Sequence, residues 1–236
     1  MALNAPVGGN SEPRELIEAG TYNARCVQII QLGTITQESG QYAGKSSMKL
    51  RVVWELVDEK RTFNPEKGEQ PLWKDKEYTF SMYKEAGLRK DIEAWRGKAF
   101  TDDEAGKFDI DKLLGQPCMV SIAHKKSDKG KEYDYITSIS KAMKGVIVAP
   151  LSNDPVYLSY NDWNDELFLS LPDWLRKKME ATPEFKAMDA AIEAQIATPP
   201  AVQVPQAFLD ATAQGAMKPN ADFFASAPAE DDEPLF

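Results

Sequence analysis

Polar and apolar residues alternate most regularly between positions 48 and 56. One set is Met48, Leu50, Val52, Trp54 and Leu56, and the other is Lys49, Arg51, Val53 and Glu55. A period of two predicts a β-strand with the first set in a core and the second set on the opposite face.

Four other segments are rich in β-branched and apolar residues, which predicts strands at 21–35, 72–82, 118–124 and 133–140. In 72–82 we expect Tyr78, Phe80 and Met82 on one face. The other face is expected to carry Trp73, Asp75, Glu77 and Thr79. Segments 37–47, 58–70 and 125–131 are rich in glycine, proline, serine or lysine and predict loops.

Leu88, Ile92 and Trp95 recur at helical spacing, which predicts a helix over 84–97 ending at Gly97. A shorter helical segment is expected over 102–114. The fold predicted from this order is mainly β with helical additions: an OB-fold, a five-stranded Greek-key barrel with its helix between strands three and four. Another small β-barrel or an α+β sandwich is the alternative. The residues expected to close the bottom of the barrel are Trp95, Phe100, Phe108, Leu113 and Leu114.

Four regions follow from these patterns. Residues 1–19 predict an irregular arm with a helical turn at 13–19, and 20–145 the barrel. Residues 146–196 predict an ordered extension that packs on the barrel, with a helix capped by Asp173, interrupted near Pro183 and resuming to 196. Its expected packing residues are Trp163, Phe168, Trp174 and Phe185, and a protein–protein surface is the alternative for them. Residues 197–236 are rich in Pro, Ala, Gln and Ser and predict a disordered linker with an acidic end.

Charge is distributed unevenly along the chain. Residues 1–150 hold 23 Lys/Arg and 22 Asp/Glu, a net of +1, whereas 151–236 hold 5 and 15, a net of −10. A nearly neutral body can carry a basic groove, so the overall net charge of −9 does not exclude DNA binding.

Several other functions are not expected. No run approaches 18 apolar residues and the N-terminus lacks a basic, apolar leader, so neither a membrane span nor a secretory signal is predicted. Cys26 and Cys118 predict buried free thiols in a reducing cytoplasm. Two cysteines and the lone His124 do not make a zinc site, and 40–46 lacks the spacing of a phosphate-binding loop. We expect no metal, no cofactor and no enzyme activity.

A nucleic-acid groove fits the pattern better. In OB-folds, strands two and three and the loops joining strands one–two and four–five contact the nucleic acid strand. The cations and aromatic residues there are Tyr42, Lys45, Lys49, Arg51, Trp73, Lys74, Lys76, Lys125, Lys126, Lys129, Lys131 and Tyr133. Cations would follow phosphates and aromatic rings would stack on bases. The alternative is that the lysine-rich hairpin is a solvated turn and that Trp73 or Tyr133 is a core residue.

The chain ends in Asp231, Asp232, Glu233, Pro234, Leu235 and Phe236. This ending resembles the acidic, Phe-terminated tip of bacterial and phage single-stranded DNA-binding proteins. The resemblance implies a non-catalytic protein that coats and protects single-stranded DNA during phage replication, recombination or repair. It also implies that the tip recruits replication or recombination proteins and competes with DNA for the groove.

This chain departs from the bacterial pattern in its long loops, its 102–114 insertion and its extension. Whether the chain forms a homo-oligomer stays open. The tetramer that is usual for the bacterial proteins is not implied for this chain. Two other functions also stay open: an interaction adaptor or acidic DNA mimic, and an OB-containing nuclease or ligase fragment.

Overall fold

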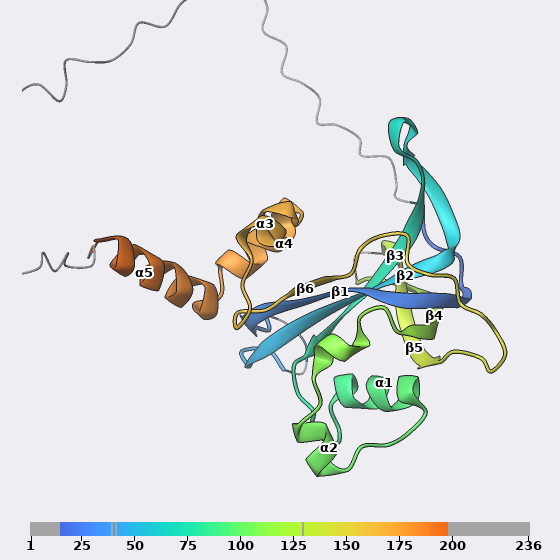
Figure 1. Cartoon of the computed structure of the whole chain (residues 1–236), viewed down its shortest axis with the longest axis horizontal. Coiled ribbons are helices and arrows are strands. Elements are labelled where there is room, and N and C mark those ends of the chain that lie inside the picture. The colour runs from blue at the N-terminus through green and yellow to red at the C-terminus, as the bar shows by residue number, and fades with distance from the viewer. Residues whose placement is uncertain (1–14, 39, 41, 129, 198–236) are drawn as a thin grey trace, which may run out of the picture. The chain divides into compact units, whose positions relative to one another are not determined.

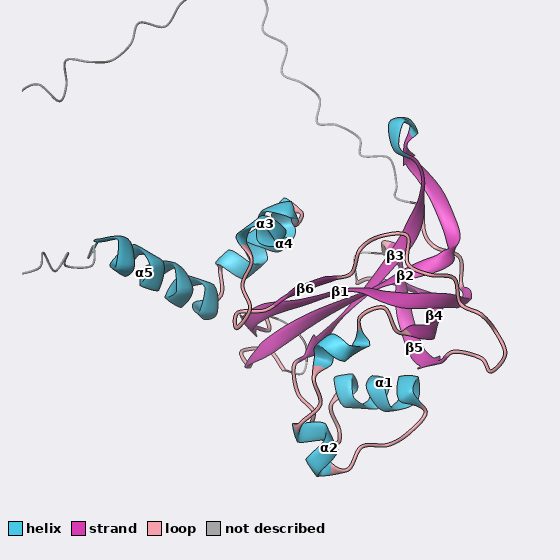
Figure 2. Ribbon diagram, in the orientation of Figure 1, coloured by secondary structure: helices cyan, strands magenta, loops and turns pink. Residues whose placement is uncertain are grey.

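The computed structural model describes residues 15–197 except 39, 41 and 129 (Figure 1). The chain separates into two compact units, Met1–Ala190 and Ala191–Phe236. Strands dominate the first unit (Figure 2). They are β1 (Gly20–Thr36), β2 (Ser46–Asn64), β3 (Gly68–Thr79), β4 (Pro117–Lys126), β5 (Glu132–Lys141) and β6 (Val156–Leu158). The α-helices are α1 (Gly87–Arg96), α2 (Asp102–Gly106), α3 (Asp165–Ser170), α4 (Asp173–Glu180) and α5 (Pro183–Ala197). Two 3₁₀ turns are η1 (Pro65–Lys67) and η2 (Ile110–Leu113).

In the described part of the chain, six strands form one open sheet in the order β3-β2-β1-β4-β5, with β6 paired to β1. All pairs are antiparallel except β1 with β6. The first residues of β1 pair with β4, and its register with β2 shifts between Cys26 and Gln28. Such a bulge bends a strand, which lets β1 serve both neighbours. The prediction of a mainly β protein is confirmed.

The predicted inward face of β2 is confirmed, because Leu50, Val52, Trp54 and Leu56 are all buried in the main core. Helix α1 covers this core with Leu88, Ile92 and Trp95, and the rings of Trp54 and Trp95 lie 6.1 Å apart. Gly97 ends α1 with a φ of 67°, a left-handed conformation that glycine adopts without strain. The expected closing residues Phe100 and Leu113 join the same core, with Phe108 and Leu114 packed against it.

The segment predicted as a loop at 58–70 is a β-hairpin instead. Strand β2 continues to Asn64, and Thr62 pairs with Glu69 across the hairpin. The strand prediction failed because most of this hairpin is exposed and polar on both faces, so no alternation marks it. The strand predicted at 72–82 ends at Thr79, and the segment predicted as helix at 102–114 divides into α2 and η2. Residues 15–19 form no helix.

A second core lies on the other side of β1. Its members are Ile30, Leu32, Leu158, Phe168, Leu171, Leu175 and Met179. Trp163 and Phe185 pack against it, as expected for these aromatic residues, whereas Trp174 is not part of this core and is 54 % exposed. Helix α4 follows Pro172 as its capping position, one residue before the predicted Asp173, and Pro183 opens α5. This core attaches residues 156–185 to β1.

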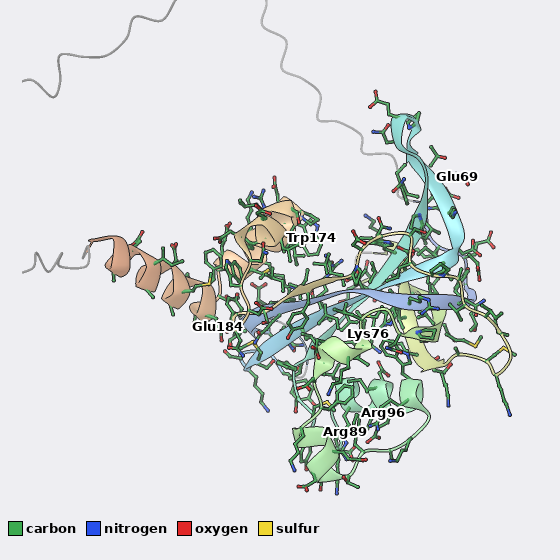
Figure 3. The ribbon with its side chains drawn as sticks, viewed as in Figure 1. Glu69, Lys76, Arg89, Arg96, Trp174 and Glu184 are labelled. Carbon is green, nitrogen blue, oxygen red and sulfur yellow. The ribbon has the colours of Figure 1, made fainter. Side chains whose placement is uncertain are left out.

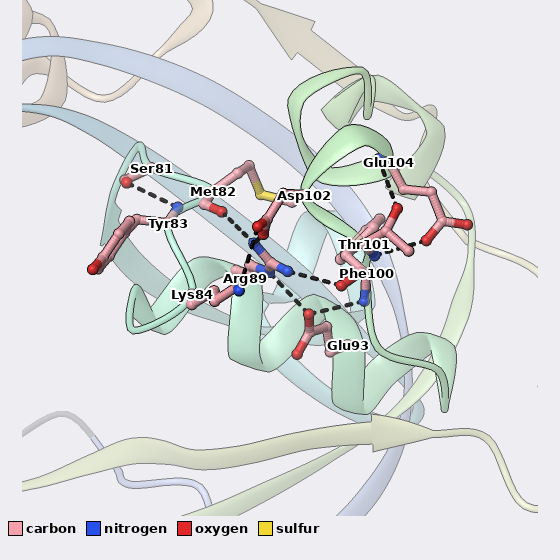
Figure 4. A network of polar contacts seen from close by, with 10 residues as sticks. All are labelled: Ser81, Met82, Tyr83, Lys84, Arg89, Glu93, Phe100, Thr101, Asp102 and Glu104. Atoms are coloured by element: carbon pink, nitrogen blue, oxygen red, sulfur yellow. Dashed lines mark hydrogen bonds and ion pairs between the residues drawn. The ribbon is translucent and has the colours of Figure 1, made fainter.

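Arg89 ties α1 to the segment that precedes α2 (Figure 4). Its guanidinium is buried and donates to the carboxylates of Glu93 (2.9 Å) and Asp102 (3.0 Å) and to the carbonyl of Phe100 (2.8 Å). Hydrogen bonding to Arg89 lowers the pKa of Asp102, and the amide of Phe100 lowers that of Glu93. The acidic run at 102–104 therefore serves the start of α2, where Thr101 and Glu104 form a capping box.

Cys26 and Cys118 are free and buried, as predicted, and burial raises the pKa of both thiols. Of the helices in the described ranges, none combines the length and apolar character needed to cross a bilayer.

Candidate nucleic-acid interface

Three aromatic side chains lie on the outer side of β3 and β5. Lys74 of β3 reaches across to β5, where its ammonium donates to the backbone carbonyl and the carboxylate of Asp134, each at 2.6 Å. Because both residues are buried, their sequence neighbours Trp73, Tyr133 and Tyr135 point outward. These three, which we call the aromatic strip, are 38 %, 40 % and 37 % exposed. The rings of Tyr133 and Tyr135 lie 6.3 Å apart.

Lysines border one end of the aromatic strip. Lys125 of β4 lies directly opposite Tyr133 of β5. Lys125, Lys126 and Lys131 are exposed, and among the described residues none of them forms an ion pair. Lys129 of the same hairpin lies outside the described residues. The β4–β5 hairpin therefore presents positive charge beside two tyrosine rings.

Trp73 is oriented by a buried carboxylate. Its indole N–H donates to Oε2 of Glu55 at 3.3 Å, and Glu55 has no exposed surface. Glu55 also accepts the backbone N–H of Ser152 (2.6 Å) and the side-chain amide of Asn153 (2.8 Å). The alternating pattern placed Glu55 on the face of β2 opposite the main core. Ser152 and Asn153, which follow β5, cover this residue.

Two predicted DNA-contacting lysines are engaged inside the fold. Lys74 lies on the same side of β3 as Leu72 and pairs with Asp134. Lys76 pairs with Asp91 of α1 at 2.7 Å, and Asp91 also accepts the hydroxyl of Tyr78. Burial, together with Asp91, raises the pKa of Tyr78. Lys74 is buried, which corrects its assignment to the outer groove, whereas the half-buried Lys76 is engaged by Asp91 of α1.

Arg51 lies on the predicted outer face of β2, but its surroundings differ from an open groove. Its guanidinium contacts Asp75 (3.2 Å) and Gln28 (3.1 Å), and its Cζ lies 5.5 Å from the ring centre of Trp174. Lys178, also on α4, pairs with Glu77 of β3. Helix α4 therefore contacts the β2–β3 face near the start of β2 and the end of β3. Figure 3 labels Trp174 on this helix.

The remaining predicted residues gather near the β1–β2 hairpin. Tyr42 is 53 % exposed, and the ammonium of Lys45 lies 5.3 Å from its ring centre. Lys49 donates to the hydroxyl of Thr79 at 3.0 Å. Because Gly20 at the start of β1 pairs with β4, this hairpin and the β4–β5 hairpin lie at opposite ends of β1. The structure thus divides the predicted site into two clusters.

Two residues were missed by sequence reasoning. Tyr135 was not selected, although it stands two positions from Tyr133 and therefore shares its face. Trp174 was assigned to packing, and no local pattern distinguishes an exposed tryptophan from a buried one on a short helix. The predicted partner-binding residues 231–236 lie outside the described residues.

Within the described ranges, no three His, Cys, Asp or Glu side chains come together as a metal site would require. Comparisons with protein-family models, with curated proteins and with solved structures found no match. The function must therefore be argued from the geometry of this chain.

Proposed function

We propose that the protein binds single-stranded DNA without sequence preference and holds it on the aromatic strip. One observation carries this proposal: Trp73 of β3 and Tyr133 and Tyr135 of β5 are partly exposed on two strands that Lys74 links, and Lys125, Lys126 and Lys131 of the β4–β5 hairpin form no ion pair in the described part of the chain. Every base has a flat π face, so aromatic side chains stack on any sequence, at about 1–3 kcal/mol per base. Lysines add attraction to phosphates that depends on salt.

The strand arrangement supports the same proposal. Three strands, the helices α1 and α2 with the turn η2, and two further strands follow one another along the chain, and Lys74 bridges β3 to β5, the two ends of the strand order. An OB-fold would have this order of strands, and its strands and loops commonly bind single strands. We infer that the sheet is an OB barrel with an added C-terminal extension.

The proposed mechanism is non-catalytic. Bound strands are kept from re-annealing and from nucleases, which is useful during phage replication, recombination and repair. Segment 231–236 would gather replication or recombination proteins, with its carboxylates at a basic rim and Leu235 and Phe236 in an apolar pocket. This last step rests on the resemblance of the acidic tip.

Binding should be selective for single strands. With the full chain, fluorescence anisotropy should give a higher affinity for oligo-dT than for duplex of equal length, because a duplex hides its base faces. Both affinities should be measured with magnesium and with a chelator. Equal affinity for the two forms would contradict the proposal. Magnesium-dependent loss of the oligonucleotide would instead support the nuclease alternative, and no binding to either form would support the adaptor.

A further inference from the structure

Trp174 faces solvent from a helix that is otherwise well anchored. Its neighbours Leu175 and Met179 are completely buried in the second core, whereas Trp174 is 54 % exposed. A large apolar ring left in water forgoes the stabilisation that burial would give. An exposed tryptophan ring offers a flat face on which a nucleic-acid base can stack.

The ring of Trp174 is nevertheless held in place. The guanidinium of Arg51 lies against it, with Cζ 5.5 Å from the ring centre. Arg51 is itself fixed by Asp75 and Gln28. A cation–π contact of this kind orients the ring without covering both of its faces. A ligand that stacks on Trp174 would therefore meet a ring that has already lost much of its freedom.

Arg51 links Trp174 to the strand that holds Trp73. Arg51 bonds to Asp75, which stands two residues after Trp73 on the same face of β3, and Arg51 lies opposite Glu77 in the register of β2 with β3. Trp73 and Glu77 are four residues apart, which is about 13 Å along a strand. Trp174 of α4, labelled in Figure 3, therefore lies farther along the β2–β3 face than Trp73.

The local charges leave room for a phosphate chain. The carboxylates at this face are paired, namely Asp75 with Arg51, Glu77 with Lys178 and Asp173 with Arg176. Lys177 of α4 is exposed and makes no ion pair within the described residues. A DNA strand that passes over Trp174 would therefore meet carboxylates that are already paired and the positive charge of Lys177.

We propose that Trp174 is a base-stacking platform that extends the DNA path from the aromatic strip onto the C-terminal extension. The inference rests on the proposed function and adds to it a binding residue outside the sheet. It predicts a dependence on length: a short strand is held by the aromatic strip, whereas a longer strand also reaches Trp174.

The test compares full-length Trp174→Ala, Trp174→Phe and Leu169→Ala with the wild-type protein. Leu169 is the matched control because it lies on α3 of the same extension and is 62 % exposed. Each protein is titrated with oligo-dT of about 4 and about 16 nucleotides, the range of single-strand site sizes for one OB-fold. Melting temperatures confirm that the variants fold.

Trp174→Ala should weaken binding of the longer strand by about 5- to 150-fold, which corresponds to the stacking of one base. Binding of the short strand should change less than twofold. Trp174→Phe should retain most of the affinity, and Leu169→Ala should behave as wild type with both lengths.

Three results would overturn the inference: no effect of Trp174→Ala, an equal loss with both lengths, or tighter binding of the longer strand. The last would show that α4 covers the DNA face. If the wild-type protein binds neither oligonucleotide, the proposed function itself fails. If the wild-type protein binds both oligonucleotides and Trp174→Ala binds them with the same affinities, the role of Trp174 is contradicted and the proposed function stands.

Discussion

At the scale of single residues, Glu55 shows how a buried charge organises the candidate interface. Its carboxylate accepts hydrogen bonds from Trp73, Ser152 and Asn153 and is completely buried. A buried carboxylate is tolerated only when its oxygens are satisfied. The Glu55 carboxylate therefore holds the indole N–H edge of Trp73. The same carboxylate also holds the chain segment that follows β5.

Tyr133 should contribute directly to DNA binding. Replacing Tyr133 by Ala is expected to weaken oligo-dT binding by about 1–3 kcal/mol, because one stacking surface is removed. Titration by fluorescence anisotropy measures this loss. Tyr83→Ala is the control, since Tyr83 is 72 % exposed and lies outside the aromatic strip. Equal effects of the two substitutions would contradict a specific role for the aromatic strip.

At the scale of elements, Gly33 sets how closely the extension approaches β1. A Cβ at this position would lie 2.6 Å from the hydroxyl of Thr182, and the residue has a φ of 95°. On the next residue, the amide and hydroxyl of Thr34 donate to the carboxylate of Glu184 at 2.8 and 2.6 Å. The start of α5 is thus held against β1. Thr182 can approach β1 this closely because residue 33 is a glycine and has no side chain.

Gly33→Ala should consequently destabilise the protein more than Gly44→Ala. Both glycines have positive φ, but a Cβ at Gly44 would meet nothing within 4 Å. The control therefore carries the backbone strain of about 1 kcal/mol without the clash. Urea unfolding should show a larger loss for Gly33→Ala. Equal losses would mean that Thr182 moves aside freely.

The contact between α1 and α2 should make stability depend on pH. Arg89 lowers the pKa of Asp102 below its ordinary value of 3.8. A lowered carboxyl pKa contributes stability above the ordinary pKa, and this contribution disappears as the pH falls through the folded-state pKa. Asp102→Asn should therefore make the unfolding free energy less sensitive to pH below about 4.

The matched control for this experiment is Asp103→Asn. Asp103 is the next residue in the first turn of α2, and its side chain is 92 % exposed. Unfolding midpoints measured between neutral and acidic pH should separate the two variants. If both variants follow the wild-type pH profile, the Arg89 contact has no part in acid stability.

At the scale of the whole molecule, two cores share β1 as their common wall. Ile29 belongs to the core beneath α1, whereas Ile30 belongs to the core beneath α4. Consecutive strand residues point to opposite faces, so one strand can serve both cores. This arrangement covers part of the outer face of the sheet and leaves the aromatic strip and the two hairpins exposed.

The distribution of charge predicts the salt dependence of binding. Replacing Lys125 and Lys126 by Ala should flatten the slope of log affinity against log salt by about 0.7 for each phosphate that is no longer neutralised. Lys90→Ala is the control, because Lys90 lies on α1 and is paired with Glu85. An unchanged slope for the double variant would place the DNA away from the β4–β5 hairpin.

Local periodicity determined most of the elements. The alternation at 48–56 and the helical spacing of Leu88, Ile92 and Trp95 correctly marked β2 and α1, because one face of each meets the main core. Gly97 correctly marked the end of α1. The basic β4–β5 hairpin and the neighbouring Tyr133 were also found from sequence, because they follow directly from the hairpin pattern.

Tertiary structure decided which face was open. The opposite face of β2 was expected to contribute Lys49 and Arg51 to a DNA groove, yet Glu55 on this face is buried by Ser152 and Asn153, about a hundred residues further along the chain. Lys74 and Lys76 were assigned to the DNA groove, but Asp134 binds Lys74 in the interior and Asp91 of α1 binds the half-buried Lys76. A period of two shows that two faces differ and says nothing of what covers each one. That depends on contacts between distant segments, which form only when the chain folds.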